Sequence, residues 1–193
     1  MSGFLSAVNL TLRDPDAAVA LLRGLRLTAA EVVAATAAIT AVSTLLGWPV
    51  LAAVPVEEGT VWALFARHPL VFAGSQFIAS LFGAAMMTWA GRAFGGKGTF
   101  TDCLLALVWV QVILTALEAV QAVLMLVVPP VAGVLSLLGF ALFFYLVVRF
   151  AAALHGFRNP ALVLLGMVGT LILTGLVLSI AAGALGLLPE PTP

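Results

Sequence analysis

Charged residues are scarce in this sequence. Only 8% of its 193 residues are Asp, Glu, Lys or Arg, whereas about 25% is typical of soluble domains. So few charges cannot cover a water-facing surface, which excludes an ordinary soluble protein. The 8 basic and 8 acidic residues also balance, so the chain has no basic surface that would attract nucleic acid. We therefore expect no nucleic-acid partner.

Cysteine and histidine are almost absent as well. The one cysteine, Cys103, cannot form an intrachain disulfide, and we interpret it as a small packing residue near a helix start. The two histidines, His68 and His155, lie far apart in the sequence, which contains no histidine–acid metal cluster and no G-x-S-x-G nucleophile elbow. We therefore expect no enzyme activity, no catalytic residue, no metal and no cofactor.

Apolar residues, by contrast, make up 63% of the chain, and its mean hydropathy is +1.23. Several apolar runs reach the roughly 20 residues with which a helix crosses a bilayer. We predict a single all-α domain over residues 1–193, a polytopic bundle of five membrane-spanning helices. The predicted spans cover approximately residues 29–54, 69–91, 103–128, 131–154 and 160–187.

Local signals indicate where these spans begin and end. Thr28 and Glu31 have the spacing of a capping box, in which each side chain satisfies a free backbone N–H at a helix start. Pro69 and Pro160 suit the first position of a helix, where no N–H is needed. The pair Pro129-Pro130 predicts a tight hairpin between the third and fourth spans.

A shorter amphipathic helix is predicted over residues 14–27, before the first span. Asp14 provides a cap and Pro15 fits the first helical position. Residues three and four apart form its apolar face: Ala18, Leu21, Leu22 and Leu25. We expect this helix to lie on the membrane surface, with Arg23 and Arg26 in contact with anionic lipid headgroups.

Basic residues predict the orientation of the spans, because cytoplasmic loops retain Lys and Arg during insertion. Only Arg67 falls on the side opposite the N-terminus. The others lie before the first span or beside the second–third and fourth–fifth connections: Arg13, Arg23, Arg26, Arg92, Lys97, Arg149 and Arg158. We expect the N-terminus in the cytoplasm and the C-terminus outside. The Ala-, Val- and Leu-rich composition with short loops suggests a bacterial inner membrane.

Three short segments are distinctive in combination. They are Leu12-Arg13-Asp14-Pro15 at the amphipathic helix, Phe94-Gly95-Gly96-Lys97-Gly98-Thr99-Phe100 before the third span, and Ala153-Leu154-His155-Gly156-Phe157, which leads through Pro160-Ala161 into the fifth. In this order they resemble the Yip family, the five-span membrane domain named after Ypt/Rab-interacting proteins. The resemblance covers most of the chain and fits a short prokaryotic-type member. Eukaryotic members act in vesicle traffic and membrane shaping, and the resemblance implies the fold more directly than a particular activity.

The glycine-rich turn also fits another motif. Residues 91–97 match G-x-x-x-x-G-K, the opening of a phosphate-binding loop, but Gly98 stands where such a loop needs Ser or Thr, and no strand precedes it. We interpret the segment as an interhelical turn with Lys97 on the cytoplasmic side, and we expect no nucleotide ligand. We interpret His155 as a helix cap or headgroup contact, with a response to cytoplasmic pH as the alternative.

Glu118 is the most informative side chain, because an ionised carboxylate within a span costs several kcal/mol. Gln111 and Gln121 lie on nearly the same helical face, which predicts a polar stripe turned away from lipid. By depth, Gln76 and Ser80 of the second span are expected to face this stripe. We favour hydrogen bonding between helices or subunits, and a proton or ion pathway is the competing interpretation.

Small residues recur every four positions in the fifth span, at Gly175, Ser179 and Gly183. Another helix can approach such a face closely, and we favour a neighbouring span of the same chain over a second copy. The whole sequence predicts a non-enzymatic adaptor or organiser of other membrane proteins or of the bilayer. Its expected partners are lipids and another membrane protein or a second copy. The alternative is a small transporter or channel subunit that uses the polar stripe of the third span.

Overall fold

Five long helices form the body of the molecule. The computed structural model describes residues 2–184, and within that range the chain forms eight helices and no strand. Five helices are long and apolar enough to cross a membrane, which confirms the predicted fold class. They are α3 (Ala29–Ala53), α5 (Pro69–Ala93), α6 (Phe100–Val127), α7 (Pro129–His155) and α8 (Pro160–Ala184).

Capping explains where these helices begin. At the start of α3, Thr28 Oγ1 accepts the Glu31 N–H at 3.3 Å, and the Glu31 carboxylate accepts the Thr28 N–H at 2.7 Å, which completes the predicted capping box. The helices α5, α7 and α8 each begin at a proline. Pro129 and Pro130 therefore occupy the first turn of α7, where a missing N–H costs no hydrogen bond, and Val128 alone separates α6 from α7.

Three shorter helices complete the chain: α1 (Ser2–Arg13), α2 (Pro15–Gly24) and α4 (Val61–Arg67). The sequence did not predict α1 or α4. Helices this short are marginal without tertiary contacts, and both have such contacts. Trp109 Nε1 of α6 donates to Thr11 Oγ1 of α1 at 2.9 Å, and Trp48 Nε1 of α3 donates to the Ala66 carbonyl of α4 at 3.1 Å.

The predicted amphipathic helix corresponds to α2, which packs against α7 and α6. Asp14 caps it as expected, since its side chain accepts the Ala17 N–H at 3.0 Å. Of the predicted apolar face, Ala18 and Leu22 are buried against the bundle, whereas Leu21 and Leu25 are exposed. The helix is therefore docked on the other helices through one half of that face, and the other half is free to contact lipid.

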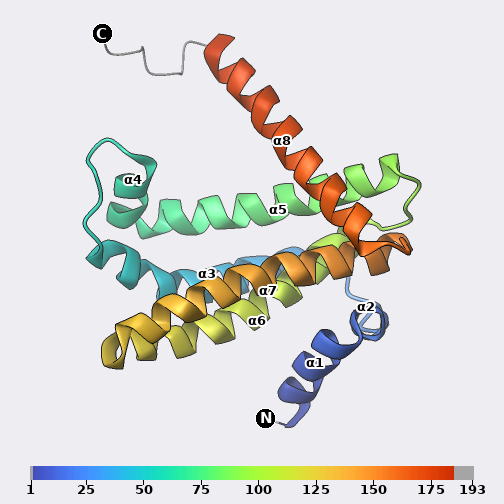
Figure 1. Cartoon of the computed structure of the whole chain (residues 1–193), viewed down its shortest axis with the longest axis horizontal. Coiled ribbons are helices and arrows are strands. Elements are labelled where there is room, and N and C mark those ends of the chain that lie inside the picture. Colours follow the sequence, from blue (N-terminus) through green and yellow to red (C-terminus); the bar gives the residue numbers. More distant parts are fainter. Residues whose placement is uncertain (1, 185–193) are drawn as a thin grey trace.

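The long helices differ in how deeply they lie in the bundle (Figure 1). Helix α6 packs against α3, α5 and α7 and contributes the largest share of the buried core. Helix α8 crosses α5 and α7 obliquely, and its C-terminal half extends away from them (Figure 1). We call the end of the bundle where the α5–α6 and α7–α8 connections meet α2 the histidine end, after His155. The opposite end carries α4 and the α6–α7 hairpin.

Candidate functional site

A seam of polar side chains joins α3 to α6 inside the bundle. Ser43 Oγ of α3 donates to Glu118 Oε2 of α6 at 2.9 Å. The sequence predicted that α5 would provide the facing partners instead. Ser80 of α5, however, donates to the Gln76 carbonyl of its own helix at 2.9 Å, and Gln76 Nε2 reaches Thr44 Oγ1 of α3 at 3.5 Å. Both polar groups of the expected α5–α6 pairing are therefore engaged elsewhere, and α3 is the partner of Glu118.

The contact between Ser43 and Glu118 fixes how α3 and α6 are aligned. The two helices run in the same direction (Figure 1), and the two residues are 75 positions apart. One helical turn nearer the histidine end, Thr40 and Thr115 repeat this spacing, and both are buried. Neither hydroxyl has a hydrogen-bond partner among the described residues. A buried polar group without a partner costs about 1–3 kcal/mol. The seam therefore contains two hydroxyl groups that are available to bond to a further polar group.

The predicted polar stripe of α6 is divided between two neighbours. Glu118 contacts α3, whereas Gln121 Nε2 donates to Ser136 Oγ of α7. Gln111 is half-buried and lies one turn before Thr115. The hydroxyls of α3 were not predicted as partners of the stripe, although they recur at helical spacing on one buried face: Thr36, Thr40, Ser43 and Thr44. The helical spacing of these hydroxyls was the signal that could have identified α3 as the partner of the stripe.

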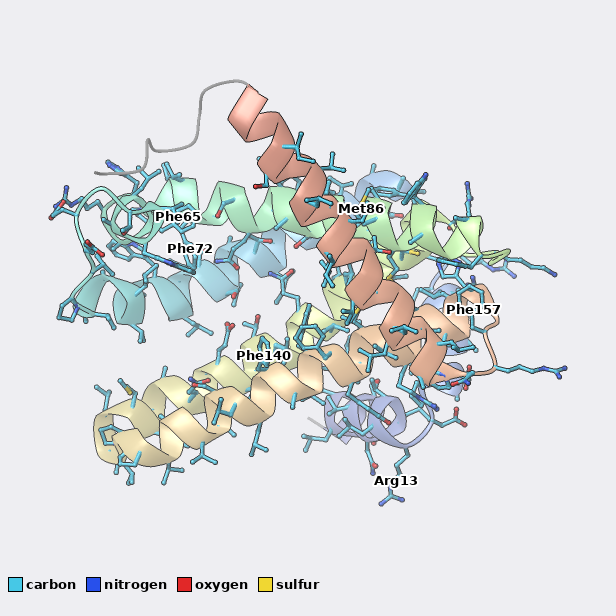
Figure 2. The ribbon with its side chains drawn as sticks, turned by 45° about the horizontal axis from the view of Figure 1, so that its top comes forward. Arg13, Phe65, Phe72, Met86, Phe140 and Phe157 are labelled. Atoms are coloured by element: carbon cyan, nitrogen blue, oxygen red, sulfur yellow. The ribbon has the colours of Figure 1, made fainter. Side chains whose placement is uncertain are left out.

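A second cluster lies at the histidine end. His155, the last residue of α7, is buried, and its Nδ1 accepts the Gly98 N–H at 3.2 Å. Cys103 Sγ lies 3.8 Å from its Nε2. Phe157, labelled in Figure 2, stacks on the imidazole at a centroid distance of 5.6 Å. Of the two roles predicted for His155, contact with lipid headgroups is therefore wrong, because the ring is buried. The ring instead accepts a backbone N–H and joins the α5–α6 turn to the end of α7.

The glycines of the α5–α6 turn leave room for this ring. A Cβ at Gly91 or Gly96 would overlap the imidazole of His155, and one at Gly98 would lie 2.7 Å from it. Only Gly95 has a positive φ, of 83°. Gly91, Gly96 and Gly98 are therefore needed because the histidine occupies the space where a side chain would be, whereas Gly95 is the one of the four that needs an unusual backbone angle.

The basic residues near the histidine end differ in whether they bond to other helices or are exposed. Arg23 donates to Asp102 Oδ2 at 3.0 Å and to the Leu154 carbonyl at 3.5 Å, so it ties α2 to α6 and α7. This pairing differs from the predicted contact with lipid headgroups. Lys97 and Arg26 are exposed, in keeping with the turn and surface positions expected of them.

At Gly175 and Ser179, the small-residue face of α8 is not covered by the part of the chain that the structure describes. Gly175 and Ser179 are exposed, and a Cβ added at Gly175 would meet no atom within 4 Å. The burial of Gly183 lies outside what the structure describes. The contact with a neighbouring span that the sequence favoured is therefore not formed at Gly175 and Ser179. Helix α8 contacts α5 just before this face, where Thr174 Oγ1 lies 3.9 Å from Met86 Sδ of α5 (Figure 2).

In a comparison with protein families, the chain matches the Yip1 domain over residues 10–181. This range runs from the end of α1 almost to the end of α8 and contains both the polar seam and the histidine end. The match confirms the resemblance carried by the three sequence segments. No curated protein and no solved structure matches the chain.

Proposed function

The chain belongs to the Yip1 domain family, and on that premise we propose that it is a non-enzymatic adaptor that holds another membrane protein against α8. The supporting observation is the exposure of this helix. None of the residues of Pro160–Val177 is buried, whereas nearly half of the most apolar stretch of α6 is. The bundle thus leaves α8 the least buried of the five spans, with most of its surface available to a helix from another protein.

The chemistry of α8 suits a helix partner. Spans associate through close packing, and small residues let two backbones approach each other. Gly175 and Ser179 lie one turn apart on the exposed part of α8, with bulky Leu176 and Ile180 beside them. A partner span that packs between such ridges gains contacts that disordered lipid chains do not provide as well.

Co-purification tests this proposal. The tagged chain, expressed at native level, is isolated in mild detergent, and its associated proteins are quantified by mass spectrometry. Ser179→Trp fills the small-residue face, and Leu137→Trp changes a position on α7 that is 71% exposed. We expect a stoichiometric membrane protein with the wild type and with Leu137→Trp that is depleted at least several-fold with Ser179→Trp. Equal recovery in all three preparations would remove α8 as the docking helix.

The polar seam supports a second candidate, a small transporter or channel subunit with Glu118 on an ion or proton path. The supporting observation is the row of buried hydroxyls beside Glu118, two of which have no partner among the described residues. Glu118→Gln keeps the side-chain shape and the hydrogen bond from Ser43 but removes the charge. In reconstituted vesicles, wild-type flux that this change abolishes would favour the pathway, and absence of flux from both proteins would exclude it.

A further inference from the structure

A groove of about 390 Å³ lies between α7 and α8, close to their connection. Its walls are largely apolar, with Phe144 and Val148 from α7 and Pro160 and Leu164 from α8. One cation, Arg149, also lines it. Because both helices are spans, the groove opens toward the bilayer, and its occupant must come from there.

Arg149 has no anionic partner in the described part of the chain. Its Nε is buried without a hydrogen-bond acceptor, and no ion pair involves its guanidinium. Asp102, an acidic residue at the histidine end, is paired with Arg23 instead. A guanidinium is a fork of five N–H donors that matches the oxygens of a phosphate. The unpaired guanidinium of Arg149 lies beside an apolar wall. The ligand that matches both is an anionic group attached to an apolar chain.

We propose that this groove binds an anionic phospholipid, with its phosphate on Arg149 and an acyl chain along Phe144, Val148 and Leu164. The depth fits this ligand. Arg149 precedes the end of α7 by six residues, or about 9 Å along the axis at 1.5 Å per residue, a distance that a long arginine side chain can bridge toward the headgroup layer. A lipid seated there contacts both α7 and α8 and supports α8 at its base. The site does not depend on the adaptor proposal.

Native mass spectrometry of the purified full chain tests the site. The probes are phosphatidylglycerol and phosphatidylcholine, added at equal concentration to delipidated protein in detergent. We expect preferential retention of phosphatidylglycerol by the wild type. Arg149→Gln removes a charge-assisted contact worth about 1.5–3 kcal/mol, so retention should fall by about tenfold or more. Equal retention of the two lipids by the wild type would overturn the proposal.

Two further variants separate this site from diffuse attraction and from misfolding. Arg158→Gln removes an exposed charge from the α7–α8 connection without touching the groove, and it should leave retention unchanged. If it lowers retention as much as Arg149→Gln does, the lipid is held by surface charge alone and the proposal fails. Leu164→Trp keeps Arg149 and fills the groove, so it should also reduce retention. Normal retention by Leu164→Trp would contradict the site even if Arg149→Gln failed to fold.

Discussion

Helices α6 and α8 are both long apolar spans, but the bundle uses them in opposite ways. Helix α6 contacts α3, α5 and α7, and it presents Glu118 and Thr115 to a polar seam. Helix α8 has no buried residue in Pro160–Val177. Apolar composition therefore establishes that a helix crosses the membrane, whereas polar and small residues determine which faces meet other helices.

The largest expected difference is between truncating a buried leucine of α6 and truncating an exposed leucine of α8. Leu104 of α6 is 1% exposed and Leu165 of α8 is 68% exposed. Leu104→Ala leaves a cavity among packed side chains and should destabilise the fold by about 2–5 kcal/mol. Leu165 faces lipid, so Leu165→Ala leaves no cavity within the protein and should have almost no effect. Unfolding in mixed micelles measures both, and equal losses would mean that α8 is packed as firmly as α6.

The glycines give the next largest effect. Gly91→Ala places a methyl group against the imidazole of His155, and such overpacking should cost about 1–3 kcal/mol. In a His155→Ala background the added methyl has room, so most of that cost should disappear. Gly169→Ala, in open space on α8, serves as the control and should be neutral or slightly stabilising. A double-mutant cycle of Gly91→Ala and His155→Ala, measured by unfolding, checks this coupling. If the two losses of stability simply add, the two residues are not coupled.

The polar seam should contribute less. Ser43→Ala removes the hydrogen bond to Glu118, and hydrogen bonds between spans average about 0.6 kcal/mol with a maximum near 1.7. We expect a loss in that range from the unfolding free energy. Thr170→Ala on α8 is the matched control, because its hydroxyl bonds only to the Gly166 carbonyl of its own helix. A loss at position 170 as large as that at position 43 would show that the seam has no special role.

The ion pair at the histidine end should have the smallest effect. Arg23 and Asp102 are partly exposed, and pairs of this kind are typically worth about 0.2–1 kcal/mol. Arg23→Gln and Asp102→Asn should each lower stability slightly, and the double mutant should be no worse than the more damaging single one. The difference should shrink in high salt because ions screen the pair. A salt-independent loss would indicate that Arg23 acts through its contact with Leu154.

The helix limits could be predicted because their signals are local. The capping box of Thr28 and Glu31, and the proline at each of three helix starts, need only a few residues of context. The five spans follow from run length for the same reason. The bounds differ little: α6 begins at residue 100 rather than 103, and the predicted end of the fifth span at 187 lies outside the described residues.

Adjacency between helices was harder to predict, because nothing local specifies it. Depth counting placed Gln76 and Ser80 opposite Glu118, but depth alone does not distinguish which neighbouring helix faces a residue. The recurring hydroxyls of α3 would have identified the correct partner. His155 and the glycines of the α5–α6 turn both stood out in the sequence, but Gly98 and His155 are 57 residues apart. Only the fold shows that the histidine ring occupies the space that the glycines leave.

The measurement that tests the contrast between α6 and α8 most directly is site-specific photo-crosslinking in native membranes. A photoreactive residue is placed at Ser179 on α8, and another at Leu137 on α7 as an exposed control. We predict a discrete adduct with another membrane protein from position 179 and only lipid adducts from position 137. Crosslinks from position 179 to the chain's own α5 or α7 would show that α8 is packed within the bundle, and would contradict it.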